Sequence, residues 1–523
     1  KLFFFANYEK ANEEYPNNYG LGASTSMVDA TQAQQILDVL KAKYPNYTAN
    51  YDNPKNYTKS DKGGVKLDWS INDKNKATFG WRIVSAKQLN YNSTAASLSG
   101  SEYPYDFKSV TNTFTGELHS TISQSLSNEF LASYVRVRDE RSPYGNAPMI
   151  QISNVGNGSV ALGTERSSAA NALNQDNWSF TDNLTWYKGD HTLTFGTHGE
   201  YYKFSNLFIQ DAYGTYYFNN LGDFKMFTEG KNIAETTDTY GNTIYYNTLK
   251  QYRYGTANTD VTGDPRWYAT FAAGQIGAYA QDKWNVTNNF ELTYGLRVDF
   301  PLFFDTPTAN TPFNDFAAAQ GWGVKTNHKL SSSPMWSPRV GFRWNINKEY
   351  KMVLRGGAGI FTGRIPFVWL SNNFSNTGIQ LSTYNVYGSS LMNADGKIMT
   401  QHKTNGKWDG TYTTTNNDGT LNNMTPILND LDQTANISKL SASGSQTINV
   451  FSDDFKFAQN LRFDLALDFT LAGVDFTVEG IYSKNLNDVV YRDLAYDATG
   501  KTLADSYSTF AFDFFFFKQK TAY

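Results

Sequence analysis

The chain has 523 residues and a formal net charge of −4, which argues against a nucleic-acid-binding protein, since such proteins usually carry a basic face. It has no cysteine, so disulfides, thiolate chemistry and cysteine-bound metals are excluded. Aromatic side chains make up 16% of the residues although the mean hydropathy is −0.52, and no run approaches the roughly 18 consecutive apolar residues of a membrane helix.

Segments with alternating apolar and polar residues follow one another in pairs. A period of two is typical of β-strands with unlike faces, and the short turns rich in Asn, Asp, Gly and Lys between the paired segments predict hairpins. The pairs are 65–71 with 77–83, 114–122 with 130–137, 178–187 with 191–202, 274–284 with 290–300, 339–346 with 351–361, and 461–471 with 474–482. With 2–9 at the start, we count roughly 13 predicted strands.

The segment "FELTYGLRVDF" (290–300) shows this pattern clearly. Its apolar residues occupy the even positions, and Glu291, Arg297 and Asp299 occupy odd ones. Globular strands usually run about 5 to 6 residues, whereas a tilted strand needs about 9 to 11 to cross a bilayer. We therefore expect membrane strands, although one strand alone would also suit a large soluble sandwich.

The connections between strands alternate strictly between short and long. The long ones are polar and rich in Tyr, Asn, Thr and Gly: 10–63, 86–112, 139–175, 205–273, 304–336 and 362–458. Membrane barrels place short turns on the periplasmic side and long loops on the extracellular side. A soluble sandwich has no reason to sort its loops in this way, so we predict an all-β, transmembrane antiparallel β-barrel.

Four tryptophans lie within a few residues of the short turns: Trp69, Trp186, Trp284 and Trp344. Indole rings favour the interface between membrane and water. We therefore expect a periplasmic aromatic girdle at these positions. The alternative is a chance placement of large core residues at strand ends.

Four stretches resemble the barrel of TonB-dependent outer-membrane receptors, in particular the Oar-like branch: "KLFFFANYE", "GAYAQDKWNVTNNFELTYGLRVD", "WSPRVGFRWNI" and "VLRGGAGIFTGRIPFVWLSNNFSNTG". The resemblance implies a Gram-negative outer-membrane barrel of about 22 strands with an N-terminal plug and a TonB box, which imports a ligand. This chain shows no plug, no TonB box and no closing aromatic-ended strand. We therefore expect 1–511 to be a partial barrel, a fragment with roughly 13 of those strands.

The last residues, "FFFFKQKTAY", follow no alternation. Lys518 to Tyr523 can be back-translated as AAG CAG AAG ACG GCA TAC, which resembles part of a common sequencing adapter. We therefore interpret 512–523 as a non-native translated artefact. A real aromatic-ended strand is the competing interpretation.

Charged residues at lumen parity predict where a plug would dock. A guanidinium fork makes directional bonds to carboxylates and carbonyls. The candidates for lumen or plug contact are Arg297, Arg339, Arg343 and Arg355. The alternative is that these residues only hydrate the lumen and pair with neighbouring charges.

Two weaker patterns have plainer explanations. His198 and Glu200 share a parity and supply half of a metal site, but no third ligand accompanies them. Gly-rich "RGGAGIFTG" (355–363) lacks the Lys-Ser/Thr of a phosphate loop, and glycines in a strand more often permit a bend or a close backbone approach, here of a plug. No metal, cofactor or catalytic constellation is predicted, so we do not expect an enzyme.

The long loops are the expected place for ligand contact. Two of them present many tyrosines among amide side chains, a surface that suits sugar or peptide ligands. The candidates are Tyr213, Tyr216, Tyr217, Tyr245, Tyr246, Tyr252 and Tyr254. Loops of this composition also occur without a ligand.

The sequence thus favours TonB-dependent uptake of an unknown ligand, such as a siderophore, glycan or peptide. The expected partners are outer-membrane lipid and, through the plug, the TonB complex. A passive porin or surface adhesin is the first alternative, and a soluble all-β binding protein is the second.

Overall fold

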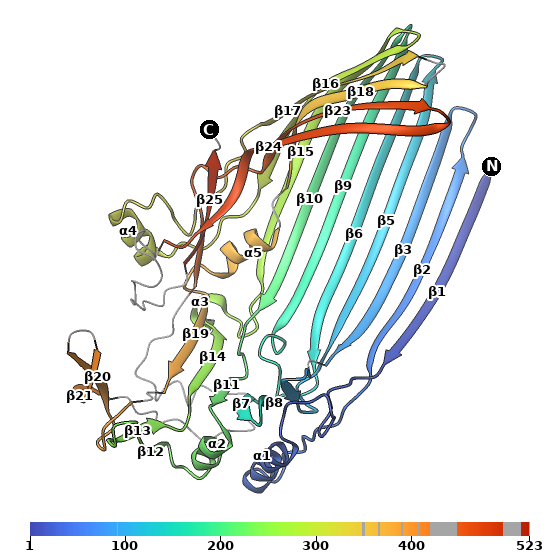
Figure 1. The fold of residues 1–523 in the computed structure, drawn as a ribbon. Helices are drawn as coiled ribbons and strands as arrows, with labels where there is room; N and C mark the ends of the chain where they lie inside the picture. Colours follow the sequence, from blue (N-terminus) through green and yellow to red (C-terminus); the bar gives the residue numbers. More distant parts are fainter. Residues whose placement is uncertain are drawn as a thin grey trace.

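The computed structural model describes residues 1–91, 93–347, 351–364, 367–388, 391–404, 407–418, 447–494 and 514–521. Thirteen antiparallel strands lie side by side as one curved wall (Figure 1). In sheet order they are β1 (Leu2–Tyr15), β2 (Asn56–Ser70), β3 (Asn75–Asn90), β5 (Tyr105–Ser123), β6 (Leu126–Pro143), β9 (Asn171–Lys188), β10 (His191–Phe208), β15 (Ala269–Thr287), β16 (Phe290–Phe303), β17 (Met335–Asn347), β18 (Met352–Thr362), β23 (Gln459–Leu471) and β24 (Val474–Arg492). The predicted strand number and pairing are confirmed.

The strands extend beyond the boundaries predicted from alternation. β1 and β2, for example, stay paired from Leu2–Trp69 to Tyr15–Asn56, well inside the predicted loop 10–63. The backbone ladder continues because its hydrogen bonds do not depend on side chains, whereas the apolar alternation ends where the strand leaves lipid. The apolar alternation therefore marks only the part of each strand that lies nearer the short turns.

The two faces of the wall differ as predicted. On β16, Leu296 is 46% exposed, whereas Asp299, on the opposite face, is only 2% exposed. We call the face that carries Leu296 and Phe300 the outer face, and the face that carries Arg297 and Asp299 the inner face. The outer face is apolar and bare, as expected for a surface in contact with lipid.

Near the long-loop end, the chain itself covers the inner face. Helix α5 (Phe367–Ser375) and strand β22 (Ile448–Phe451) pack there on Phe204, Phe271 and neighbouring residues of β10 and β15. Part of the connection between β18 and β23 is therefore folded into the mouth of the wall. This covering identifies the inner face independently of its charge.

The long connections also build a second, six-stranded sheet beyond the end of the wall (Figure 1). Its order is β19 (Leu381–Tyr387), β14 (Gln251–Ala257), β11 (Thr215–Phe218), β7 (Met149–Val155), β8 (Gly158–Leu162) and β4 (Ser97–Ser99). Helices α1 (Ala30–Lys43) and α2 (Leu221–Thr228) share one hydrophobic core with it. We call this unit the loop domain.

Smaller elements complete the connections. They are the hairpins β12 (Ile233–Thr237) with β13 (Thr243–Asn247) and β20 (Lys397–Thr404) with β21 (Lys407–Asp418), and the helices α3 (Thr259–Thr262) and α4 (Thr311–Ala319). None of the helices that the structure describes has the length and hydropathy to cross a membrane.

At the C-terminus, β25 (Phe514–Thr521) pairs with β24 and, in parallel, with β22. Residues 512–513 and 522–523, which belong to the predicted artefact, lie outside the described residues. The artefact interpretation and the boundary at 511 stay predictions. The wall is not closed, because β1 lies at one end of the strand order and β22 at the other.

Candidate functional site

The inner face carries networks of charged side chains. Arg297 donates from Nε and Nη2 to Asp299 at 2.7 and 2.6 Å, and the Gln275 amide donates to the same carboxylate at 2.8 Å. The guanidinium also lies over the Tyr279 ring, 5.4 Å from its centroid. Arg297, a predicted plug contact, is therefore already engaged within the wall.

A second network links the wall to the connection after β18. Glu200 accepts a bond from Arg364 Nη1 at 2.8 Å, and its other oxygen lies 3.3 Å from His198 Nε2. The Nδ1 atom of His198 lies 2.8 Å from the hydroxyl of Thr181. No group of three metal-ligating side chains occurs among the described residues, and the second partner of Glu200 is an arginine rather than a ligand.

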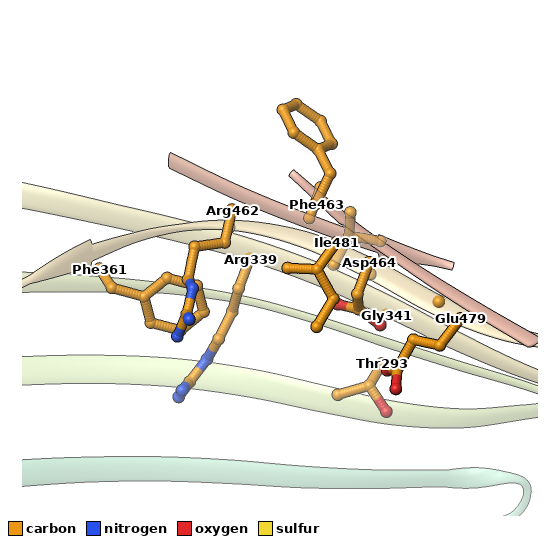
Figure 2. A pocket seen from close by; sticks show the side chains of 14 residues that line it. Thr293, Arg339, Gly341, Phe361, Arg462, Phe463, Asp464, Glu479 and Ile481 are labelled. Carbon is orange, nitrogen blue, oxygen red and sulfur yellow. The ribbon is translucent and has the colours of Figure 1, made fainter. Parts of the chain in front are cut away.

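A hollow of about 500 Å³ opens on the inner face over β16, β17, β18, β23 and β24. Gly341, Gly357 and Gly359 contribute to it, and their missing side chains create the space. Figure 2 shows Arg339 and Arg462 pointing together to this side, whereas Phe463 points to the other. The glycine-rich stretch thus lines a depression in the wall, and the close approach of a plug there stays a prediction.

The arginines around the hollow differ in their partners. Arg355 pairs with Asp468 at 2.9 Å and with Glu479 at 3.6 Å. Arg339, Arg343 and Arg462 are exposed, and none of them forms an ion pair with a carboxylate of the described residues. Of the four predicted arginines, Arg339 and Arg343 therefore have no ion-pair partner within the part of the wall that the structure describes. Arg462 has the lumen parity that its sequence position predicts, but it is not one of the four predicted contacts.

The seven candidate tyrosines occupy two kinds of position in the connection between β10 and β15. Tyr216, Tyr252 and Tyr254 are buried in the core of the loop domain, so their rings hold the sheet together from inside. Tyr213, Tyr217, Tyr245 and Tyr246 are half-buried and keep part of their surface in solvent. Burial raises the pKa of Tyr217, so its phenol remains a neutral hydrogen-bond donor. Ligand contact stays a prediction for these four residues.

The four predicted girdle tryptophans lie on the outer face at the short-turn end. Trp69, Trp186 and Trp344 are exposed, and Trp284 stacks on His191 with the ring centroids 5.2 Å apart. A second aromatic row crosses the outer face nearer the long loops, from Phe114 through Tyr134, Trp178 and Tyr201 to Phe304. Trp178 and Trp186 lie on the same strand, about 26 Å apart at roughly 3.3 Å per residue. Two such rows are the expected boundaries of a lipid-facing band.

The sequence of this two-faced wall matches the family profile described as "Outer membrane beta barrel domain" over residues 5–474. The chain belongs to this family. The barrel therefore resides in the cell outer membrane, with its short turns on the periplasmic side and its loop domain outside. The family match does not support the alternative of a soluble all-β binding protein.

Solved structures of outer-membrane proteins have the same fold. The outer membrane transporter YddB of Escherichia coli matches with a TM-score of 0.50 at 10% identity, covering 99% of this chain and 47% of that one. The siderophore receptor PirA of Pseudomonas aeruginosa (TM-score 0.40, 10% identity, 90% and 54% coverage) and FpvA of P. aeruginosa (0.44, 11%, 89% and 45%) also match.

The match to YddB confirms the predicted resemblance at the level of the fold. The chain spans about half the length of the solved structures it matches. No curated protein matches the sequence significantly.

Proposed function

We propose that this barrel belongs to a transporter that takes up a ligand in a TonB-dependent manner, with a separate plug segment seated on the inner face. The observation that carries the proposal is the hollow with its unpaired arginines. Arg339 and Arg462 are exposed on the inner face and form no ion pair with a carboxylate in the described part of the wall, so both guanidinium groups are available to a docked segment. An acidic or carbonyl-rich surface of a plug would supply acceptors for them.

The glycines support the same arrangement. A backbone can approach the wall closely at Gly341, because no side chain stands there. The neighbouring networks of Arg297 and Glu200 are satisfied internally and would form a fixed rim beside the docked segment. PirA is a siderophore receptor and FpvA was solved with bound pyoverdines, so ferric siderophores are the first cargo to test for this barrel.

The loop domain is the proposed first contact for the ligand. The half-buried Tyr217 and Tyr213 offer aromatic surface at low conformational cost. We propose no chemical reaction. The TonB complex would act through the plug and not on the described strands.

The test is to fill the hollow in the intact protein. A Cβ at Gly341 would meet only the Gly356 carbonyl oxygen at 3.6 Å, which is ordinary contact, so Gly341→Leu can fold and yet block docking. Gly480→Leu is the matched control, because a Cβ there has nothing within 4 Å and lies on the outer face. We expect Gly341→Leu to lower energy-dependent uptake of ferric siderophores about tenfold or more, and Gly480→Leu to leave it unchanged.

Collapse of the proton-motive force separates the alternatives. A TonB-dependent transporter stops accumulating ligand, whereas a passive porin continues to admit it. Uptake that persists without the proton-motive force, or that Gly341→Leu leaves intact, would contradict the proposal. Cell-surface attachment without any uptake would favour the adhesin.

A further inference from the structure

An acidic residue lies on the lipid-facing side of the wall. Asp282 on β15 has the same parity as Ala280 and Trp284, and its partner across the ladder is the outward Tyr294. One carboxylate oxygen, Oδ2, lies 2.7 Å from His191 Nδ1 and accepts the Tyr294 hydroxyl at 2.9 Å. The residue is 5% exposed, and no described donor reaches its other oxygen, Oδ1.

A buried carboxylate oxygen without a donor is costly, because it loses its water and gains nothing in return. A hollow of about 400 Å³ opens beside it, lined by Leu193, Phe195, Ala280, Asp282, Tyr294 and Leu296, with three residues of the other parity. One of those three is Arg339, whose side chain points to the inner face (Figure 2). Small Ala280 between larger apolar neighbours creates the space on the outer face.

The register places this hollow at the level of the periplasmic girdle. Leu193 pairs with Trp186 on one side and with Asp282 on the other. His191 stacks on Trp284 at 5.2 Å, two residues along from Asp282. Tryptophan rows mark the depth of lipid head groups, so the carboxylate lies at head-group depth and the apolar part of the hollow extends toward the acyl chains.

We propose that this hollow is a binding site for a phospholipid with a primary ammonium head group, of the phosphatidylethanolamine class. The ammonium donates to Asp282 Oδ1, and an acyl chain lies over Ala280 between Phe195 and Leu296. His191 and Tyr294 hold the carboxylate in place through Oδ2. An ammonium carries three N–H donors on a positive charge, whereas the quaternary amine of phosphatidylcholine has no N–H to donate.

The two lipids therefore provide the test. The full-length protein is extracted from outer membranes, delipidated in mild detergent and titrated with phosphatidylethanolamine or phosphatidylcholine of identical chains, and native mass spectrometry counts the bound lipid. We expect one retained phosphatidylethanolamine with a preference of about tenfold over phosphatidylcholine. Asp282→Asn should abolish the preference.

Asp182→Asn is the matched control. Asp182 is also acidic and on the outer face, but it accepts a bond from Asn128 at 2.9 Å and does not line the hollow, so the preference should remain. Ala280→Phe keeps the carboxylate and fills the hollow, so it should remove the retained lipid. Equal binding of both lipids by the wild type, a preference that survives Asp282→Asn or Ala280→Phe, or its equal loss in Asp182→Asn would overturn the proposal.

Discussion

At the scale of single residues, Asp211 holds two connections of the loop domain together. Its side chain is fully buried and accepts bonds from Arg166 at 2.9 and 2.8 Å and from Thr215 at 2.7 Å. Arg253 Nε lies 3.1 Å away, near enough for an ion pair but without hydrogen-bond alignment. One carboxylate therefore neutralises guanidinium groups from β14 and from the connection between β8 and β9.

Asp211→Asn keeps the shape of the side chain but removes the charge. Two partly buried guanidinium groups would then repel each other without compensation, so we expect the loop domain to lose about 3 kcal/mol of stability. Hydrogen exchange of the amides in 149–162 and 215–218 measures the loss. Asp260→Asn changes an exposed carboxylate of α3 and should have no effect. Equal protection in both variants would contradict the assigned role of Asp211.

Asp238 couples the two exposed hairpins. Desolvation opposes its ionisation, but hydrogen bonds from Asn242, Tyr412 and the Tyr240 backbone prevail and lower its pKa to about 2. The depressed folded-state pKa means that the coupling is complete above the ordinary value of 3.8 and is lost as the pH falls through about 2.

The packing of Trp408 on Tyr240, with centroids 4.3 Å apart, reports this coupling. We expect the fluorescence difference between wild type and Trp408→Phe to be constant above pH 4 and to change between about pH 4 and pH 2. The same difference in an Asp238→Asn background should be flat across this range. A transition in that background would show that another group is responsible.

The burial of single tyrosines in the loop domain could not be predicted from the sequence. The segment "QYRYG" (251–255) alternates, but for a short strand outside the membrane the alternation alone does not predict which of the two sets of side chains is buried. Tyr252 and Tyr254 turned out to face the core of the loop domain, and Arg253 faces away from it. In the wall, by contrast, lipid fixes the apolar parity outward, so the placement of Arg297 and Arg339 was predictable.

At the scale of elements, the loop domain is one cooperative unit assembled from separate connections. Residues of α1, β7, β11, α2 and β14 share a single core, although they come from three different hairpin connections. Within this domain, residues 149–152 of β7 pair in parallel with residues 215–218 of β11, which links two of these connections directly. Local destabilisation should therefore spread across the connections and not remain in one of them.

Leu37→Ala tests this cooperativity. Leu37 on α1 is 2% exposed, and truncation of such a side chain costs about 2 to 5 kcal/mol. We expect amides of 150–162 and 216–227 to lose protection together, while β5 and β6 in the wall keep theirs. Leu21→Ala, at an exposed position in the same connection, is the control. Loss confined to α1 would contradict a shared core.

The sequence could not predict this second sheet for a physical reason. β4 and β11 have three and four residues, too few for a period to be recognised, and each pairs with a strand from another connection, β4 with β8 and β11 with β7. The strands of the wall have 11 to 19 residues and pair with sequence neighbours through short turns, so alternation and turn chemistry sufficed.

At the scale of the whole molecule, the barrel combines three surroundings: lipid on the outer face, an aqueous or plug-filled inner face, and solvent around the loop domain. The hollow around Gly341 lies on the inner face over β16, β17, β18, β23 and β24, whereas the hollow beside Asp282 lies on the outer face, mainly over β10, β15 and β16. The proposed plug and the proposed lipid therefore do not compete for the same space. Both proposals depend on the assignment of the two faces.

Spin labels on β16 test that assignment most directly, and residues 1–523 contain no cysteine that would compete for the label. Labels are placed at Leu296→Cys and Thr293→Cys in the intact protein in its membrane. Oxygen should relax the label at 296 more efficiently than a water-soluble nickel complex does, because this position faces lipid. The label at 293, which lines the inner hollow, should show the reverse. Equal collision rates at the two positions, or the opposite order, would contradict a wall with lipid outside and water or plug within.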